Sequence, residues 1–169
     1  TELKLLLNEI GVDTKHLITQ KNRTVSKKTR IIASQQQVIR YDRESNNDID
    51  IQSQEALTNS FKKIINNYEI LLLSDYGKGV LTYEVTRNLI KFANLSNIRV
   101  LIDPKGHDYS KYKGAFLLTP NKKEASEATK ISIEDKLSLN KAIKTLKKDF
   151  ELTISLITMS EQGIALYDN

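Results

Sequence analysis

Residues 115–124 read AFLLTPNKKE, and this stretch passes from an apolar β-strand directly into an α-helix. Pro120 suits the first helical turn, where a missing N–H removes no hydrogen bond. Asn121 and Glu124 lie one turn apart, so their side chains point the same way. As local structure the pair is a helix cap with a capping box. Because open α/β sheets bind ligands where strands end and helices begin, the pair is also a candidate for binding phosphate or metal-linked water.

Helical and apolar extended segments alternate along the rest of the chain. Periodicity predicts helices over 2–10, 52–67, 82–94, 121 onward and 134–148, and strands over 70–73, 98–102, 115–118, 152–158 and 163–167. The unbroken apolar run at 70–73 is typical of a strand buried on both faces. The last strand is expected to pair antiparallel with its predecessor. The pattern predicts an α/β fold with right-handed crossovers and a doubly wound, mostly parallel sheet.

Two shorter runs, 29–33 and 37–41, mix β-branched and polar residues and are separated by Ser34-Gln35-Gln36. They predict an antiparallel hairpin within about residues 24–43. Arg30 and Arg40 make one of its faces polar. The hairpin is therefore interpreted as a flap open to solvent or to a partner.

Composition narrows the class of protein. The 169 residues are 39% hydrophobic and 28% charged, as in a globular domain. No apolar run approaches the ~20 residues of a membrane span, and no signal peptide opens the chain, so we expect a cytoplasmic protein without a membrane partner. The sequence has no cysteine and only two histidines, which excludes thiolate sites and a multi-histidine zinc centre. Any metal should be a hard, oxygen-bound ion such as Mg²⁺.

The net charge of +5 does not indicate nucleic-acid binding. The 26 basic residues of the chain are nearly matched by 21 acidic ones and are spread along the sequence. The basic run at 141–148 has the pattern of a solvated helix face. Phosphorylated small molecules suit this charge balance as well as nucleic acid does.

Three further strand ends carry polar residues that suit a ligand site. After 70–73, SDYGKG at 74–79 offers the Asp75 acceptor, the Lys78 cation and two glycines that let the backbone approach a ligand. After 98–102, DPKG at 103–106 supplies Lys105, which can pair with Asp103 or with a phosphate. The alternative interpretation of each is an ordinary turn.

The third strand end is TMSEQG at 158–163, where Thr158, Ser160 and Gly163 could line nucleotide phosphates or simply form a hairpin turn. In a doubly wound sheet all these ends share one edge, so together they predict one site. The sequence contains no Walker loop and no Gly-x-Gly-x-x-Gly string.

With these groups in order, the chain resembles the ribokinase-like (PfkB) sugar kinase family, most closely its heptose 7-phosphate kinase branch. The Asn-x-x-Glu of Asn121 and Glu124 is general to the family. The strings DYGKG at 75–79 and SEQG at 160–163 point to the heptose branch, and the similarity also includes QQVIRYD at 36–42 and VLIDPKG at 100–106.

The resemblance implies transfer of the γ-phosphate of ATP to the anomeric hydroxyl of D-glycero-D-manno-heptose 7-phosphate, toward ADP-heptose for lipopolysaccharide core. It implies that Glu124 acts on Mg²⁺ through bound water and that Asn121 contacts phosphate oxygens. The implied ATP-binding residues also include Lys105, Thr158, Ser160 and Gly163. The implied substrate-binding residues are Asp75, Tyr76, Lys78, Gly79 and Arg30.

The hairpin resembles the lid of the family, which in this branch joins two subunits, so a homodimer is expected. The family's Gly-Ala-Gly-Asp motif, which supplies the catalytic base and oxyanion hole, occurs nowhere in these residues. We therefore expect residues 1–169 to be an internal part of one kinase domain, with its α/β core over about 52–169. The catalytic base is expected beyond Asn169, and the 169 residues alone are expected to be inactive. The alternatives are another ribokinase-like sugar kinase, or a non-catalytic nucleotide-binding or dimerisation module.

Overall fold

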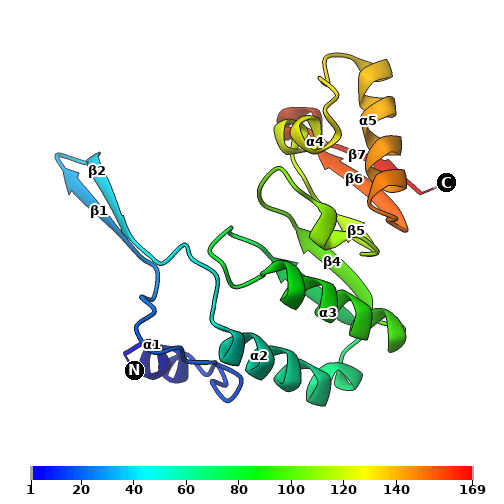
Figure 1. Cartoon of the computed structure of the whole chain (residues 1–169). Helices are drawn as coiled ribbons and strands as arrows, with labels where there is room; N and C mark the ends of the chain where they lie inside the picture. The colour runs from blue at the N-terminus through cyan, green and yellow to red at the C-terminus, as the bar shows by residue number, and fades with distance from the viewer. Residues whose placement is uncertain (1, 169) are drawn as a thin grey trace.

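A computed structural model describes residues 2–168, which form an α/β body and a separate two-stranded hairpin (Figure 1). The helices are α1 (Glu2–Glu9), α2 (Ile51–Ile64), α3 (Tyr83–Leu95), α4 (Lys122–Thr129) and α5 (Lys136–Asp149). The strands are β1 (Lys27–Ala33), β2 (Gln36–Arg43), β3 (Ile70–Ser74), β4 (Arg99–Asp103), β5 (Leu117–Leu118), β6 (Ile154–Thr158) and β7 (Ile164–Tyr167). Residues 2–168 also contain three short 3₁₀ helices, η1 (Ile65–Asn67), η2 (Ser110–Tyr112) and η3 (Ser160–Gln162).

The central sheet has the strand order β3-β4-β5-β6-β7. Strands β3 to β6 are parallel, and β7 pairs antiparallel with β6, so the predicted mostly parallel sheet is confirmed. Strand β5 is shorter than the predicted run. Phe116, just before β5, nevertheless hydrogen-bonds to both neighbouring strands: its N–H donates to Val100 O of β4 at 2.9 Å, and its carbonyl accepts from Ile154 N of β6 at 2.9 Å.

Helices α3, α4 and α5 supply one buried face of the sheet. Leu73, Val100 and Ile102 alternate along β3 and β4 and join the core with side chains of these helices. The prediction that 70–73 is buried on both faces is wrong here, because within residues 2–168 the core packs on the face of Leu73, and Leu72 on the other face is 69% exposed. The second helical layer of a doubly wound sheet is not found among residues 2–168.

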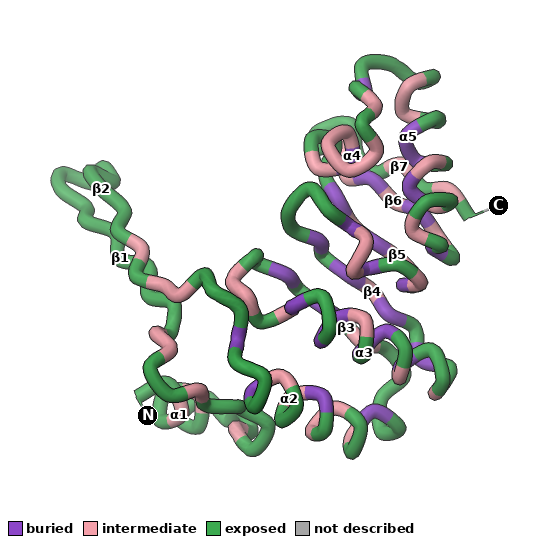
Figure 2. The backbone as a smooth tube through the Cα atoms, in the orientation of Figure 1, coloured by how far each residue is buried: buried purple, intermediate pink, exposed green. Residues whose placement is uncertain are grey.

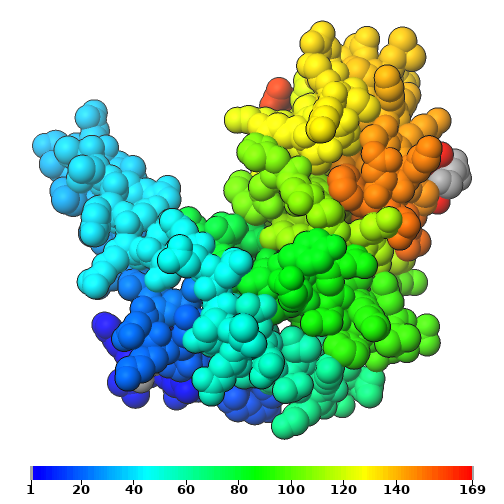
Figure 3. All heavy atoms as spheres, viewed as in Figure 1, coloured from blue at the N-terminus to red at the C-terminus, as the bar shows by residue number. Residues whose placement is uncertain are grey.

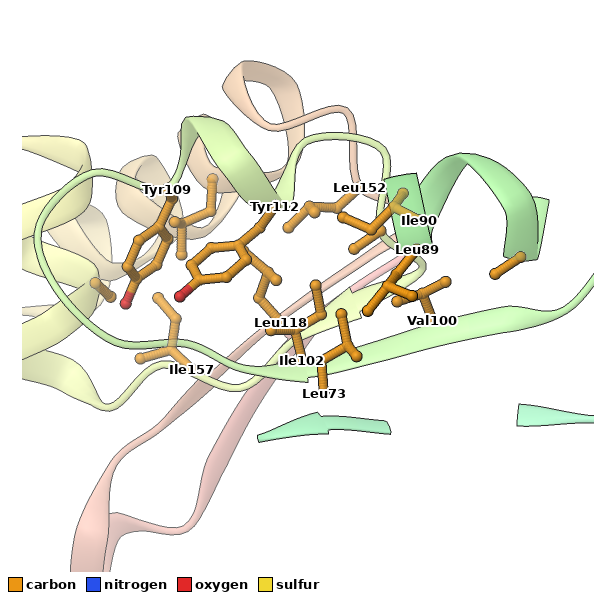
Figure 4. Close-up of a cluster of buried hydrophobic side chains, with 14 of the residues drawn as sticks. Leu73, Leu89, Ile90, Val100, Ile102, Tyr109, Tyr112, Leu118, Leu152 and Ile157 are labelled. Atoms are coloured by element: carbon orange, nitrogen blue, oxygen red, sulfur yellow. The ribbon is translucent and has the colours of Figure 1, made fainter. Parts of the chain in front are cut away.

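The segment between β4 and β5 packs into this core. Its Tyr109 and Tyr112 are fully buried, with ring centroids 5.5 Å apart in an edge-to-face arrangement (Figure 4). Such a pair adds to the stability given by apolar burial alone. The two rings anchor the 104–114 segment beside the strand ends.

Strands β1 and β2 form the predicted hairpin, with Ile31 opposite Ile39. Ser34 and Gln35 both have positive φ angles, 49° and 65°, as a two-residue turn between right-twisted strands requires. The hairpin stands off from the α/β body (Figures 1 and 3), and every residue of β1 is exposed (Figure 2). No helix within residues 2–168 has both the length and the apolar character needed to cross a bilayer.

Candidate active site

A cleft of about 410 Å³ lies where β3, β4, β5 and β6 end. It is lined by six of the side chains predicted from the sequence: Asp75, Tyr76, Lys105, Asn121, Glu124 and Thr158. Asp103 also lines it. The prediction that separate strand ends converge at one edge of the sheet is confirmed as geometry.

Asn121 and Glu124 form a complete capping box at the start of α4. Asn121 Oδ1 accepts from Glu124 N at 2.9 Å, and Glu124 Oε2 accepts from Asn121 N at 3.0 Å. The other carboxylate oxygen, Oε1, accepts from Lys105 Nζ at 3.1 Å. The capping box therefore fixes the orientation of the Glu124 side chain. It holds Oε2, so Oε1 points toward the cleft and Lys105.

Thr158 is tied to the same helix start. Its N–H donates to Pro120 O at 2.9 Å, and it forms an isolated parallel bridge with Asn121. Tyr76 lies at the edge of the cleft with 67% of its surface exposed. The cleft thus has an aromatic edge on the β3 side and a hydroxyl on the β6 side.

The two aspartates in the cleft have opposite electrostatic environments. At Asp103, partial burial and the neighbouring Glu124 raise the pKa above its ordinary value, against the effect of Lys105. At Asp75, burial alone would raise the pKa, but hydrogen bonds from Lys111, Tyr112 and Gly77 outweigh it and lower the pKa. Asp75 is therefore held as a carboxylate.

Asp75 has its oxygens occupied by protein donors. Oδ1 accepts from Gly77 N at 2.7 Å, and Oδ2 accepts from Lys111 Nζ at 2.6 Å and from Tyr112 Oη at 2.7 Å. Only 5% of the residue is exposed. No local sequence pattern predicts Lys111 or Tyr112 as partners of Asp75, because they reach it across more than thirty residues.

Lys78 and Gly79 follow the same strand but lie outside the cleft. Lys78 forms an ion pair with Glu44 at the base of the hairpin. Gly79 has a φ of +70°, and a Cβ there would lie 2.1 Å from Asn47 O. This glycine is required by close packing between the 75–79 loop and the segment that leads away from β2.

Ser160, Gly163 and Arg30 are also outside the cleft. Ser160 and Gly163 lie in the turn that joins β6 to β7, where Gly163 N donates to Ser160 O at 3.0 Å. The hairpin-turn interpretation is thus correct as local structure. Arg30 lies on exposed β1, opposite Arg40.

The cleft combines groups that suit a phosphorylated ligand. The side chain of Lys105 is 56% exposed, and the N-terminus of α4 presents its positive dipole end nearby. Among residues 2–168 there is no cluster of three or more His, Cys, Asp or Glu side chains with metal-binding geometry. Mg²⁺ commonly binds through one or two carboxylates together with substrate phosphates and water, and the carboxylates of Asp103 and Glu124 both line this cleft, where they could accept hydrogen bonds from metal-bound water.

Comparison with known proteins agrees with this geometry. The model of the pfkB family carbohydrate kinases matches residues 1–169. The chain is 55% identical to the bifunctional protein HldE of Aliarcobacter butzleri over 99% of its length and 50% identical to that of Campylobacter fetus, also over 99%. It spans about a third of the length of these curated relatives, 35% and 36%.

Solved structures share the fold at low sequence identity. The tetrameric inhibited form of phosphofructokinase-2 from Escherichia coli matches with a TM-score of 0.71 at 19% identity, covering 99% of this chain and 55% of that one. Arabidopsis thaliana ribokinase complexed with ribose and ATP matches with a TM-score of 0.68 at 15% identity, covering 100% and 55%. The fold is ribokinase-like, and the chain belongs to the pfkB family of carbohydrate kinases.

Proposed function

We propose that these residues are an internal part of a kinase domain that phosphorylates D-glycero-D-manno-heptose 7-phosphate at its anomeric hydroxyl. The observation that carries the proposal is the convergence of Lys105, Asn121 and Glu124 on one strand-end cleft. The identity of about half of all positions to HldE proteins supports the heptose branch over other sugar kinases. The product would be heptose 1,7-bisphosphate, toward ADP-heptose and lipopolysaccharide core, and the use of ATP suits the cytoplasm.

The reaction forms one P–O bond and breaks another. The anomeric oxygen attacks the γ-phosphorus of ATP, the bond to the β-phosphate oxygen breaks, and ADP leaves. The hydroxyl proton passes to a base, which we place in a Gly-Ala-Gly-Asp motif outside these 169 residues. Phosphoryl transfer is catalysed mainly by positioning and by charge stabilisation, so Lys105 and the α4 N-terminus would hold phosphate oxygens while charge moves to ADP.

Mg²⁺ would neutralise part of the phosphate charge when bound. Glu124 fits its second shell, because the capping box holds one carboxylate oxygen and leaves the other able to accept from a metal-bound water. Asn121 would orient phosphate oxygens from the same helix start. Thr158 would contact ATP phosphates. Ser160 and Gly163, in the turn after β6, would bind the nucleotide next to it.

The sugar phosphate would bind on the β3 side of the cleft, with Tyr76 at its edge. Asp75, Lys78 and Gly79 would shape that side, and Arg30 would reach it when the hairpin closes. We further propose that the hairpin joins two subunits of a homodimer. Ile31 and Ile39 face each other across the strands and are 54% and 53% exposed, which leaves an apolar face for a second copy.

A substrate screen of the full-length gene product tests this function. ADP formation is measured with heptose 7-phosphate, fructose phosphates and ribose, each with Mg·ATP. Strong preference for heptose 7-phosphate is expected. Preference for another sugar would indicate a different specificity in the same family, and ATP binding without turnover of any sugar would indicate a non-catalytic nucleotide-binding module. Residues 1–169 alone are expected to show no sugar-dependent ADP formation.

A further inference from the structure

We propose that Lys111 and Tyr112 are positioning residues, which use buried Asp75 to fix the main chain of Lys105 in the cleft. This inference rests on the proposed function, in which Lys105 contacts a phosphate. It assigns Asp75 a role as an internal anchor between two strand-end loops. The ligand then meets Lys105 and Tyr76, and Asp75 acts through its neighbours.

Lys111 brings a cation to a nearly buried carboxylate. Its Nζ lies 2.6 Å from Asp75 Oδ2 and also donates to Leu81 O at 3.0 Å. Its side chain is only 20% exposed, and that of Asp75 is 3% exposed. A buried carboxylate needs such a partner, so Lys111 keeps Asp75 ionised and ties the 75–81 loop to the 104–114 segment.

Tyr112 links Asp75 to the main chain of Lys105. Its hydroxyl donates to Asp75 Oδ2 at 2.7 Å and accepts from the Lys105 N–H at 3.1 Å. The ring is fully buried in the core, so the position of the hydroxyl is set by packing. The hydroxyl oxygen of Tyr112 thereby joins the loop after β3, the loop after β4 and the core, and the N–H that it binds belongs to Lys105, whose side chain reaches Glu124.

The substitution Tyr112→Phe tests the link because it removes the hydroxyl and keeps the ring. Tyr109→Phe is a matched control: Tyr109 is equally buried, and its hydroxyl has no hydrogen-bond partner among residues 2–168. Hydrogen–deuterium exchange of the 103–108 segment is measured in the full-length protein. Tyr112→Phe and Lys111→Met should accelerate exchange at Lys105 about tenfold or more, and Tyr109→Phe should not.

Kinetics of the same full-length variants test the consequence. Lys105→Met and Tyr112→Phe should each lower kcat/KM for ATP, by about 100-fold and 10-fold, and the double variant should be no worse than Lys105→Met within about threefold. If the two residues acted independently, the double variant would lose about 1000-fold in kcat/KM. Lys111→Arg should recover most of the activity that Lys111→Met loses. Lys113→Met, which breaks only an exposed ion pair with Glu151, should behave as wild type.

Unchanged exchange at Lys105 in Tyr112→Phe, or multiplicative losses in the double variant, would overturn the positioning role. A wild-type protein that phosphorylates no sugar would instead overturn the proposed function. In that case the exchange experiment still decides whether Lys111 and Tyr112 order the main chain of Lys105.

Discussion

Lys105 Nζ lies 3.1 Å from Glu124 Oε1, although the two residues are 19 positions apart in the sequence. The contact joins the end of β4 to the first turn of α4. Glu124 is also held by the backbone of Asn121, whereas more than half of the Lys105 side chain is exposed. Lys105 is therefore the member of the pair that can turn to an incoming phosphate.

Replacing Lys105 with methionine should lower kcat/KM by about 100-fold, since a hydrogen bond to a charged group contributes roughly 1.5–3 kcal/mol. The matched control is Lys122→Met, which removes an exposed lysine of α4 outside the cleft lining. Steady-state kinetics of the full-length protein would measure both. Equal losses in the two variants would mean that general positive charge, and not Lys105, attracts the substrate.

Replacing Asn121 with alanine should have two separable effects. Loss of the N-cap should destabilise the protein by about 1 kcal/mol, and loss of the amide should weaken Mg·ATP binding about tenfold. Thermal unfolding and isothermal titration of the full-length protein measure the two effects.

Helix α5 supplies the control for this experiment. Asp135 caps α5 through Ser138 N at 2.7 Å and also forms a capping box, but it does not line the cleft. Asp135→Ala should lose similar stability and keep Mg·ATP affinity. If Asn121→Ala keeps that affinity as well, the motif is only a helix cap.

Asp75 should make stability depend on pH with a defined sign. Because its pKa is lowered in the folded protein, its stabilising effect is present above the unfolded-state pKa near 3.9 and is lost as pH falls through the lower folded value. Asp75→Asn should therefore destabilise the full-length protein by about 2 kcal/mol at pH 7, and the difference from wild type should shrink below about pH 4. Thermal unfolding across pH measures this, and a constant difference between pH 3 and pH 7 would contradict it.

The pattern of the sequence predicted the order of the elements and the convergence of the strand ends. Asn121 was found in this way because strand, Pro120 and capping box are adjacent in sequence. The exposed face of Leu72 was not predicted, because an apolar run does not show whether both faces of its strand are covered. The Asp75–Lys111 contact was not predicted either, since it depends on how the 104–114 segment packs.

The hairpin should determine the oligomeric state. Ile39→Lys places a charge on the apolar face that Ile31 and Ile39 form, so the proposed homodimer of the full-length protein should dissociate to monomers. Lys28→Glu, on the opposite face of β1, is the control and should remain dimeric. Sedimentation velocity distinguishes the two, and an intact Ile39→Lys dimer would place the interface elsewhere.

The most direct test of the account is the product made by the full-length protein from heptose 7-phosphate and Mg·ATP. Phosphorus-31 NMR should show ADP and a new phosphate coupled to the anomeric proton, in equal amounts, and Glu124→Gln should greatly slow their appearance. ADP formation without an anomeric phosphate, or no reaction of the wild-type protein, would contradict the assignment of the strand-end cleft as a heptose 7-phosphate kinase site.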